Sequence, residues 1–390
     1  NGRGVWGSDF GSCSFVIRNK SMQKFQGSYK RLFDVQGEVQ SNEELKAKFF
    51  SSKYYLNAIS EFEKIPSYPI AYWMSKNKMA LFQKARKLSD HIFSEGPCKT
   101  GNDEIYLRLF WEVSSRKINS QDGWCLCSKG GPSRKYFGNI EHVILWTENS
   151  RKHYKSDKIA RITPDHVWDV NGITWTIVTA KAASSFRLLP RGCKFNSVSP
   201  TVFLKKYLES DFYKILALLN SKVAEDILGF LNPTMAMNVG NVISLPYASM
   251  PEIDLNAFKS LIELYEKDWN FSENSFRFSG IPIITETKLD KSIESSWVSW
   301  NLCSQKNISL AQAIERNNNQ AFIEAYGLQD ELSEEVPESE ITLARADREK
   351  DCQRLISYAI GCMMGRYSLD EPGLIYAHEG NVGFDASRYK

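Results

Sequence analysis

The stretch FYKILALLNSKVAEDILGFLN (residues 212–232) separates two kinds of sequence in this chain of 390 residues. Its apolar side chains recur at helical spacing, so we expect helix here, with an apolar stripe that packs against other elements. Short strands are predicted before this stretch and helices after it, which indicates an α+β fold. The apolar positions are Phe212, Ile215, Leu216, Leu219, Val223, Ile227 and Leu231.

The residues from Glu95 to about Pro246 predict a β-rich region. Segments with Trp, Tyr, Val and Ile alternate with Gly, Asn and Ser turns, a pattern typical of short strands. Asn232-Pro233 is expected to end the preceding helix, because proline cannot continue one. We expect Asn238 and Gly240 to turn the chain into a last strand. The best strand candidates are IYLRLFWEV (105–113), HVILWTE (142–148), VWDV (167–170), ITWTIVTA (173–180) and TVFL (201–204).

Helices are predicted for most of the chain after Leu255. Ser309 with Gln312 fits a capping box at a helix start, and Gly327 suits the left-handed position after the end of the same helix. The run DELSEEVPESE (330–340) holds six acids and no base, which indicates a solvated loop between two helices.

The first 92 residues predict two strands followed by a connector. The strands are CSFVIRN (13–19) and SYKRLFDV (28–35). Two strands cannot hold a fold by themselves, so we expect them to be the last strands of a sheet that lies mainly upstream. The connector is expected to contain a helix within 42–60 and another that Ser75 caps and that runs to about Leu88.

Charge and composition exclude several classes of protein. The net charge of +3 excludes a uniformly basic surface. The absence of a run of about 18 apolar residues predicts no membrane span. The chain opens with Asn-Gly and has no visible export signal, so we expect a piece of a larger cytoplasmic protein. The eight cysteines are expected to be reduced and mostly buried, since Cys125-Leu126-Cys127 lacks further zinc ligands.

Positive charge is concentrated in the β-rich region. Residues 129–206 hold 14 Lys or Arg and 5 Asp or Glu, a net charge of +9 against +3 for the whole chain. Such a block is typical of a surface that binds a phosphate backbone. Aromatic residues lie between these bases and could stack, but the same pattern also fits ordinary strands with aromatic residues inward and lysines outward. These aromatics are Trp124, Tyr136, Phe137, Trp146, Trp168 and Trp175.

Two loops add to the nucleic-acid interpretation. CKTGNDEIYLRL (98–109) places a tight polar turn before a predicted strand, and SKGGPSRKYFGN (128–139) is a glycine-rich loop with three bases. We expect Asn102, Arg134 and Lys135 to reach base edges, so that Arg134→Ala relaxes sequence preference while Lys181→Ala weakens all DNA binding. The predicted DNA-contacting residues are Lys99, Thr100, Asn102, Lys129, Arg134, Lys135, Arg151, Lys152, Lys181, Arg187, Arg191 and Lys194.

No catalytic site is predicted within the chain. A base-flipping amino-methyltransferase needs a glycine-rich cofactor turn and a Pro-Pro-aromatic loop, and Asn232-Pro233 is followed by Thr234 and Met235. A metal-dependent nuclease motif would need an acid where Thr179 stands, before Lys181. The five histidines show no metal-ligand spacing. We therefore predict no catalytic, cofactor or metal residues here.

The chain resembles the C-terminal half of the PglX-type adenine-specific DNA methyltransferases of BREX phage-defence systems, which are related to type IIG restriction-modification enzymes. The last of the segments that carry the resemblance is the most specific, because it is long and unusual in composition. The segments are FGSCSFVIRN (10–19), FEKIPSYPIAYWMS (62–75), KTGNDEIYLRLFWEV (99–113), SKGGPSRKYFGN (128–139), GITWTIV (172–178), NPTMAMNVGNVISLP (232–246), AYGLQDEL (325–332) and LISYAIGCMMGRYSLDEPGLIYA (355–377).

The resemblance implies four regions and a role in DNA recognition. The regions are the terminal strands of a methyltransferase domain (1–35), a connector with helices (36–92), a β-rich target-recognition domain (93–250) and a helical C-terminal domain (251–390). The resemblance implies N6-adenine methylation with S-adenosylmethionine by the full-length enzyme, whose catalytic motifs lie upstream. The expected partners are double-stranded DNA and the upstream methyltransferase domain.

An alternative hypothesis comes from a different class of protein. The chain could be a non-catalytic interaction module that binds other defence-system subunits or a phage inhibitor that mimics DNA charge, using the same basic surface. The salt dependence of binding to a DNA oligonucleotide separates the two hypotheses.

Overall fold

The computed structural model describes residues 13–20, 22, 25–32, 39, 41–66, 68–120, 122–178, 185–232, 236–248, 250–286, 292–377 and 387. Contacts within the chain divide it into two compact units, residues 1–85 and 86–390. The structure is mixed α and β with small sheets, as the sequence predicts in outline. The finer division at residues 35, 92 and 250 stays a prediction.

The described residues of the first unit form a small two-stranded sheet and three helices. Its elements are β1 (Gly27–Tyr29), α1 (Asn42–Ser51), β2 (Tyr55–Asn57), α2 (Ile59–Phe62) and α3 (Lys76–Lys84). Strand β1 pairs with β2 in antiparallel register. The ring of Tyr29 stacks on Tyr72 at a centroid distance of 5.0 Å, so aromatic contacts reinforce a sheet that is too small to be stable alone.

Three predictions for this unit need correction. Residues 13–19 form no strand; Val16 in this segment is fully exposed. Strand β1 ends at Tyr29 and pairs with β2 of the same chain, while residues 33–35 of the predicted strand lie outside the described residues. The helix predicted within 42–60 ends at Ser51, before the aromatic and branched residues of β2. Ser75 does cap α3, since its hydroxyl accepts a hydrogen bond from the Lys78 N–H at 3.2 Å.

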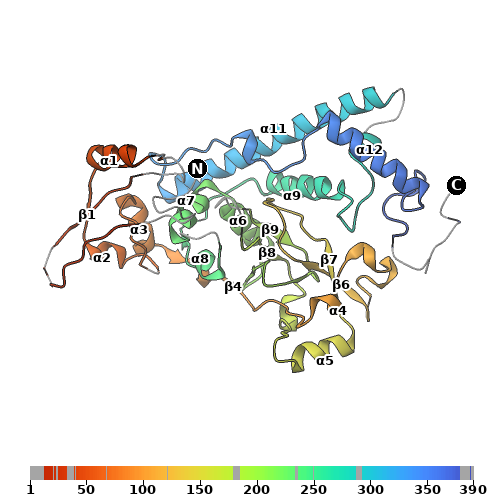
Figure 1. Cartoon of the computed structure of the whole chain (residues 1–390), viewed down its shortest axis with the longest axis horizontal. Coiled ribbons are helices and arrows are strands. Elements are labelled where there is room, and N and C mark those ends of the chain that lie inside the picture. Colours follow the sequence, from red (N-terminus) through yellow and green to blue (C-terminus); the bar gives the residue numbers. More distant parts are fainter. Residues whose placement is uncertain are drawn as a thin grey trace. The chain divides into compact units, whose positions relative to one another are not determined.

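The second unit packs two four-stranded sheets beneath a layer of helices (Figure 1). One sheet has the order β10-β6-β7-β5 and the other β4-β11-β8-β9. The strands of the unit are β3 (Arg86–Lys87), β4 (Ile92–Phe93), β5 (Leu107–Leu109), β6 (Trp124–Ser128), β7 (His142–Leu145), β8 (Gly172–Thr174), β9 (Arg187–Leu189), β10 (Lys194–Phe195), β11 (Thr201–Leu204) and β12 (Pro246–Tyr247).

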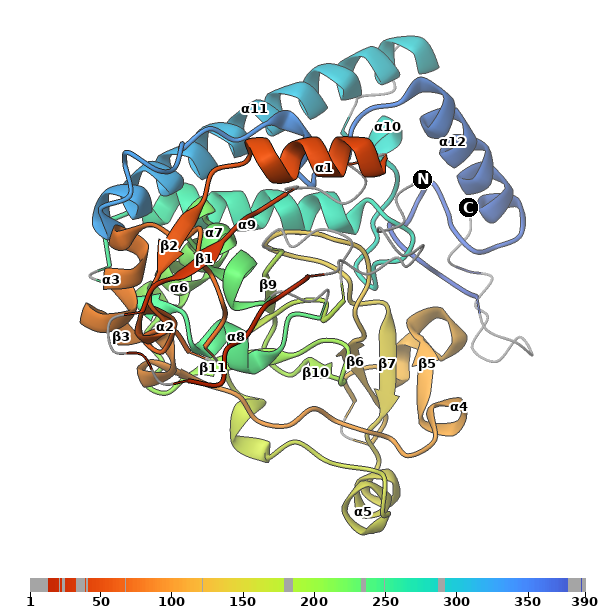
Figure 2. The same ribbon diagram turned by 60° about the vertical axis from the view of Figure 1, so that its left-hand side comes forward.

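The helical layer is built around one long helix. In both ribbon views α9 runs beneath α11, and α12 lies near the beginning of α11 (Figures 1 and 2). Helix α11 contacts α6, α7, α9 and α10. The helices of the unit are α4 (Asp103–Tyr106), α5 (Glu148–Ser156), α6 (Glu209–Leu219), α7 (Lys222–Leu231), α8 (Val239–Ile243), α9 (Leu255–Asn270), α10 (Pro282–Thr285), α11 (Ile293–Tyr326) and α12 (Arg348–Met363).

Residues 212–232 belong to two helices that are buried along one side. The apolar positions predicted from their spacing are all buried. Asn220 and Ser221 separate α6 from α7, and the Ser221 hydroxyl accepts from the Ala224 N–H as the N-cap of α7. Helix α7 ends at Leu231 with Asn232 as its C-cap, so the prediction that this position ends a helix is confirmed.

Three further predictions are corrected in this unit. Asn238 begins a helix, α8, instead of a turn, and the Asn241 side-chain oxygen accepts a hydrogen bond from the Asn238 N–H at 3.2 Å. Helix α11 begins at Ile293, so Ser309 lies in its interior, although Gly327 does end it in the left-handed conformation with φ 67°. Residues 167–170 form no strand; Trp168 instead closes a tight turn onto Asp165.

Candidate nucleic-acid interface

The turn at residues 98–103 is fixed against the segment that follows α5. Lys99 and Arg161 exchange two backbone hydrogen bonds of 2.8 Å. Gly101 has φ +77°, and a Cβ atom at this position would lie 2.9 Å from a carboxylate oxygen of Asp157. The glycine therefore permits both the left-handed backbone and the close approach. Asn102 caps α4, with its side-chain oxygen accepting from the Glu104 N–H.

Helix α5 packs one face on the core and exposes a basic face. The buried Tyr154 donates its hydroxyl proton to the Leu145 carbonyl at 2.8 Å. His153 lies 2.9 Å from the Thr100 carbonyl through Nε2 and stacks on Tyr106, which ties the helix to the turn. Figure 2 shows α5 nearly end-on at the rim of the unit, away from the helical layer.

The turn and α5 together gather exposed cations from three segments of the chain. We call this set the α5 surface: Lys99, Lys152, Lys155, Lys158 and Arg161 are exposed, and Lys129 and Arg151 are half-buried at its edge. Lys152 pairs with Glu148 at 2.7 Å, but both side chains are about 70% exposed, so this pair contributes little to stability. The cations are therefore available to an anionic ligand.

The carboxylate of Asp103 contacts a member of this basic set, Lys129. Asp103 accepts a hydrogen bond from Lys129 Nζ at 2.8 Å and from the Thr100 hydroxyl at 2.5 Å. Partial burial opposes ionisation of Asp103, but the hydrogen bonds from Lys129 and Thr100 outweigh it and lower the pKa of the carboxyl group. Thr100, a predicted DNA contact, is buried and donates its hydroxyl hydrogen bond to Asp103. Asn102, another predicted contact in the same turn, is exposed.

The second half of the glycine-rich loop 128–139 enters the interior, whereas residues 131–133 are exposed. Arg134 pairs with Asp268 of α9 at 2.7 Å, and Lys135 pairs with Glu315 of α11 at 2.7 Å. All four side chains are nearly buried. Tyr136 and Asn139 adopt positive φ in the same loop. We call residues 128–139 the latch, since it joins the sheets to the helical layer.

The latch corrects the expectation for two candidate residues. Because Arg134 and Lys135 have buried carboxylate partners, neither is presented to a base edge in this structure. We therefore leave both out of the residues that we propose for DNA contact. The signal that sequence reasoning missed lies far along the chain, in Asp268 and Glu315.

Arg134→Ala is now expected to change stability and not sequence preference. The free energy of unfolding should fall by about 2 kcal/mol, because Asp268 loses its cation but keeps a 2.9 Å hydrogen bond from the Ala344 N–H. Urea denaturation of the two proteins measures this change. A variant with unaltered stability and a relaxed DNA preference contradicts the structural role.

Two more predicted contacts lie in the core. Arg187 is fully buried and donates hydrogen bonds to the Thr176 hydroxyl and the Arg134 carbonyl, and burial together with the charge of Arg134 lowers its pKa to about 9. Lys194 is 4% exposed and lies 3.7 Å from the ring centroid of Trp168 and 4.5 Å from that of Trp146. Both are left out of the proposed contacts for this reason.

The remaining candidates have different positions. Arg191 is exposed on the turn between β9 and β10. Lys181, like Thr179, lies outside the described residues. Most of the interleaved aromatics are core residues, since Tyr136, Phe137, Trp168 and Trp175 are buried while Trp124 and Trp146 are half-buried. The aromatic residues therefore reflect packing of the core, and the candidate interface is defined by its exposed cations.

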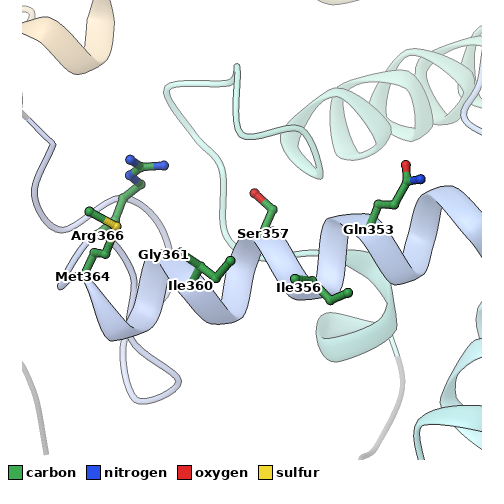
Figure 3. A pocket seen from close by; sticks show the side chains of 7 residues that line it. All are labelled: Gln353, Ile356, Ser357, Ile360, Gly361, Met364 and Arg366. Atoms are coloured by element: carbon green, nitrogen blue, oxygen red, sulfur yellow. The ribbon is translucent and has the colours of Figure 1, made fainter.

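Helix α12 presents an apolar face that the helical layer leaves uncovered. Figure 3 shows the side chains that line a shallow concavity of about 370 Å³ along this helix and the turn after it. Ile356 and Ile360 are at least half exposed, and Met363 and Met364 more so. Arg366 lies at one end of the concavity.

The described part of the chain offers little for metal or thiol chemistry. In it, no group of three or more His, Cys, Asp or Glu side chains is placed to hold a metal ion. The eight cysteines are free; Cys98, Cys127 and Cys193 are buried, while Cys13 and Cys352 are exposed. Burial raises the pKa of the Cys127 thiol well above its ordinary value, which opposes thiolate reactivity. Among the helices that the structure describes, none has both the length and the apolar character of a membrane span.

Comparison with known proteins gives relatives over nearly the whole chain. No family model matches. The chain is 32% identical to the adenine-specific methyltransferase PglX of Lacticaseibacillus casei (strain Zhang), across 97% of this chain and 33% of the relative. It is 31% identical to the adenine-specific methyltransferase BrxX of Escherichia coli O9:H4 (strain HS), across 95% of this chain and 32% of that protein.

A solved structure of the type IIL restriction-modification enzyme MmeI in complex with DNA shows a much weaker likeness. Its TM-score is 0.30 at 10% identity, with 62% of this chain and 33% of that chain covered. At this level the match supports no statement about this chain. The chain spans about one third of the length of the curated relatives. The resemblance predicted from the sequence is thus confirmed: over nearly its whole length this chain is similar to the PglX and BrxX adenine-specific methyltransferases.

Proposed function

We propose that this chain is the DNA-reading part of an S-adenosylmethionine-dependent adenine-N6 DNA methyltransferase that acts in phage defence in the cytoplasm. The observation that carries the proposal is the α5 surface. Its cations come from the turn at Lys99, from α5 and from the segment ending at Arg161, and backbone pairing holds these segments together. Cations on a phosphate-binding surface release counterions and give most of the affinity for duplex DNA.

Catalysis and cofactor binding are proposed to reside elsewhere in the full-length protein. A nucleotide-like cofactor is typically held where a glycine-rich turn leads from a strand into a helix. Among the described residues, β6 and β10 pair in parallel. The glycine-rich loop after β6 leads to β7, with no helix between them. The loop between β6 and β7 therefore does not fit S-adenosylmethionine, and we derive no step that involves this cofactor.

The double variant Lys155→Ala/Lys158→Ala is expected to weaken DNA binding without regard to sequence. Loss of two phosphate contacts should lower affinity for all duplexes and reduce the steepness of log K against log salt by about 2. Fluorescence anisotropy with a labelled duplex, repeated at several salt concentrations, measures both quantities.

The matched control is Lys306→Ala/Lys350→Ala, which removes two exposed lysines from the helical layer. This variant should bind DNA as the wild type does. Equal losses in the two double variants would show that net charge matters and that the α5 surface does not. Failure of the wild-type chain to bind any duplex contradicts the proposed function itself.

A protein-interaction module is the second candidate function, and one observation favours it. The uncovered apolar face of α12, with Ile356, Ile360 and Met363, is the kind of surface that a helix of another defence-system subunit can cover. Ile360→Glu separates the candidates, because it should abolish binding of such a subunit while leaving the affinity for DNA unchanged.

A further inference from the structure

Among the acids that lie near the α5 surface, Glu148 and Asp157 have local roles. Glu148 pairs with Lys152 one turn along the same helix. Asp157 accepts hydrogen bonds of 2.8 Å from the N–H groups of Ile159 and Ala160, which closes the loop after α5. Asp103 differs from both, because its partner Lys129 comes from a distant segment of the chain and the Thr100 hydroxyl donates a second hydrogen bond to the same carboxylate.

The carboxylate of Asp103 is oriented but not enclosed. Its side chain is 54% exposed while it contacts Lys129, and the buried Thr100 holds it from below. The hydrogen bonds that lower its pKa keep it ionised near neutral pH. Gly101, fixed against Asp157, sets the position of the turn from which Asp103 projects. The turn therefore presents an oriented, charged acceptor beside Lys129.

An anion on a surface for DNA has a cost, because it repels the phosphate backbone. The cost is offset where the carboxylate accepts a hydrogen bond from a base, and in the major groove cytosine N4 is the donor that Asp and Glu read. Lysine is the complementary reader, since it donates to guanine O6 and N7. The Lys129–Asp103 pair holds a donor and an acceptor 2.8 Å apart.

We propose that Asp103 determines sequence specificity by accepting a hydrogen bond from the N4 amino group of a cytosine in the major groove, with Lys129 as its positioning residue. The inference rests on the proposed function, because it concerns which base the α5 surface reads. Thr100 fixes the carboxylate before DNA arrives, so little side-chain freedom is lost on binding.

Selection of bound sequences from a randomised duplex tests the inference with three proteins: the chain itself, Asp103→Asn and Glu104→Gln. We expect the chain to prefer cytosine at one position by about tenfold or more. Asp103→Asn should lose that preference. The ionised carboxylate has two acceptor oxygens and no donor, whereas the amide has one acceptor oxygen and an NH2 group that donates. Glu104→Gln removes the same charge from the adjacent exposed residue and should keep the preference.

A measurement on the unmodified chain makes the test independent of how the variants fold. N4-methylcytosine at the preferred position blocks the groove-facing amino proton, and we expect the affinity to fall about tenfold. Equal binding of the two duplexes, or an unchanged cytosine preference in Asp103→Asn, overturns the inference and leaves the proposed function intact. A chain that binds no duplex at all overturns both.

Discussion

Glu315→Ala is expected to lower the free energy of unfolding by about 3–5 kcal/mol, which is the cost of leaving one partner of a buried ion pair uncompensated. Glu315 is 3% exposed and accepts from Lys135 Nζ at 2.7 Å and from the Tyr265 hydroxyl at 3.3 Å. Burial raises the pKa of Glu315 even though Lys135 acts to lower it. Urea denaturation of the wild type and the variant measures the loss.

The control for this prediction is Glu324→Ala, because Glu324 is an exposed carboxylate on the same helix. Its effect should stay below about 1 kcal/mol. The double replacement Lys135→Met/Glu315→Leu should recover much of the lost stability, since apolar pairs often replace buried ion pairs without loss. If Glu315→Ala and Glu324→Ala prove equally mild, the latch does not hold the helical layer.

Asp351→Ala is expected to cost about 4 kcal/mol and to loosen α12. Asp351 is 2% exposed, and its Oδ2 atom accepts hydrogen bonds from the indole N–H groups of Trp297 and Trp300 and from the Asp347 backbone N–H. Each buried donor that loses its acceptor costs about 1–3 kcal/mol, and partial rearrangement keeps the loss for the variant below the sum over the three donors. Urea denaturation measures the loss in free energy of unfolding, and hydrogen exchange of the α12 amides shows whether this helix is destabilised.

Glu349→Ala provides the comparison on the same helix. Glu349 is exposed in the first turn of α12, where a carboxylate is worth about 0.3–1 kcal/mol through the helix dipole. Exchange rates in α12 should rise for Asp351→Ala and stay near wild type for Glu349→Ala. Uniform exchange across the chain in Asp351→Ala would mean that this aspartate does not anchor α12 in particular.

Local patterns in the sequence were sufficient for some elements and not for others. TVFL (201–204) is a strand as predicted, because a short apolar run between polar residues fits one buried on both faces. The strand Trp124–Ser128 was not predicted, because it has no β-branched residue and its Cys-x-Cys pattern also fits metal binding. The capping box at Ser309 was misleading because Trp300, Ser304 and Ile308 continue the buried stripe upstream.

The candidate site was predictable in charge but not in detail. The concentration of bases in 129–206 is visible in the sequence, and the α5 surface draws on it. What the sequence could not reveal is which bases have buried partners, because Arg134 and Asp268 are 134 residues apart. The sequence around a long polar side chain does not show whether it is buried, because its burial depends on residues that are distant in the sequence.

The latch has a consequence for how this protein can acquire new specificities. Its cations Arg134 and Lys135 join the sheets to the helical layer, whereas Lys99, Asp103, Lys152 and Lys155 are exposed on a turn and a helix that other contacts anchor. Replacing one of these exposed residues therefore changes the contacts with a ligand and leaves the buried contacts of the fold unchanged. Variation can accumulate on that rim one residue at a time, and no intermediate along the route has to sacrifice its ability to fold.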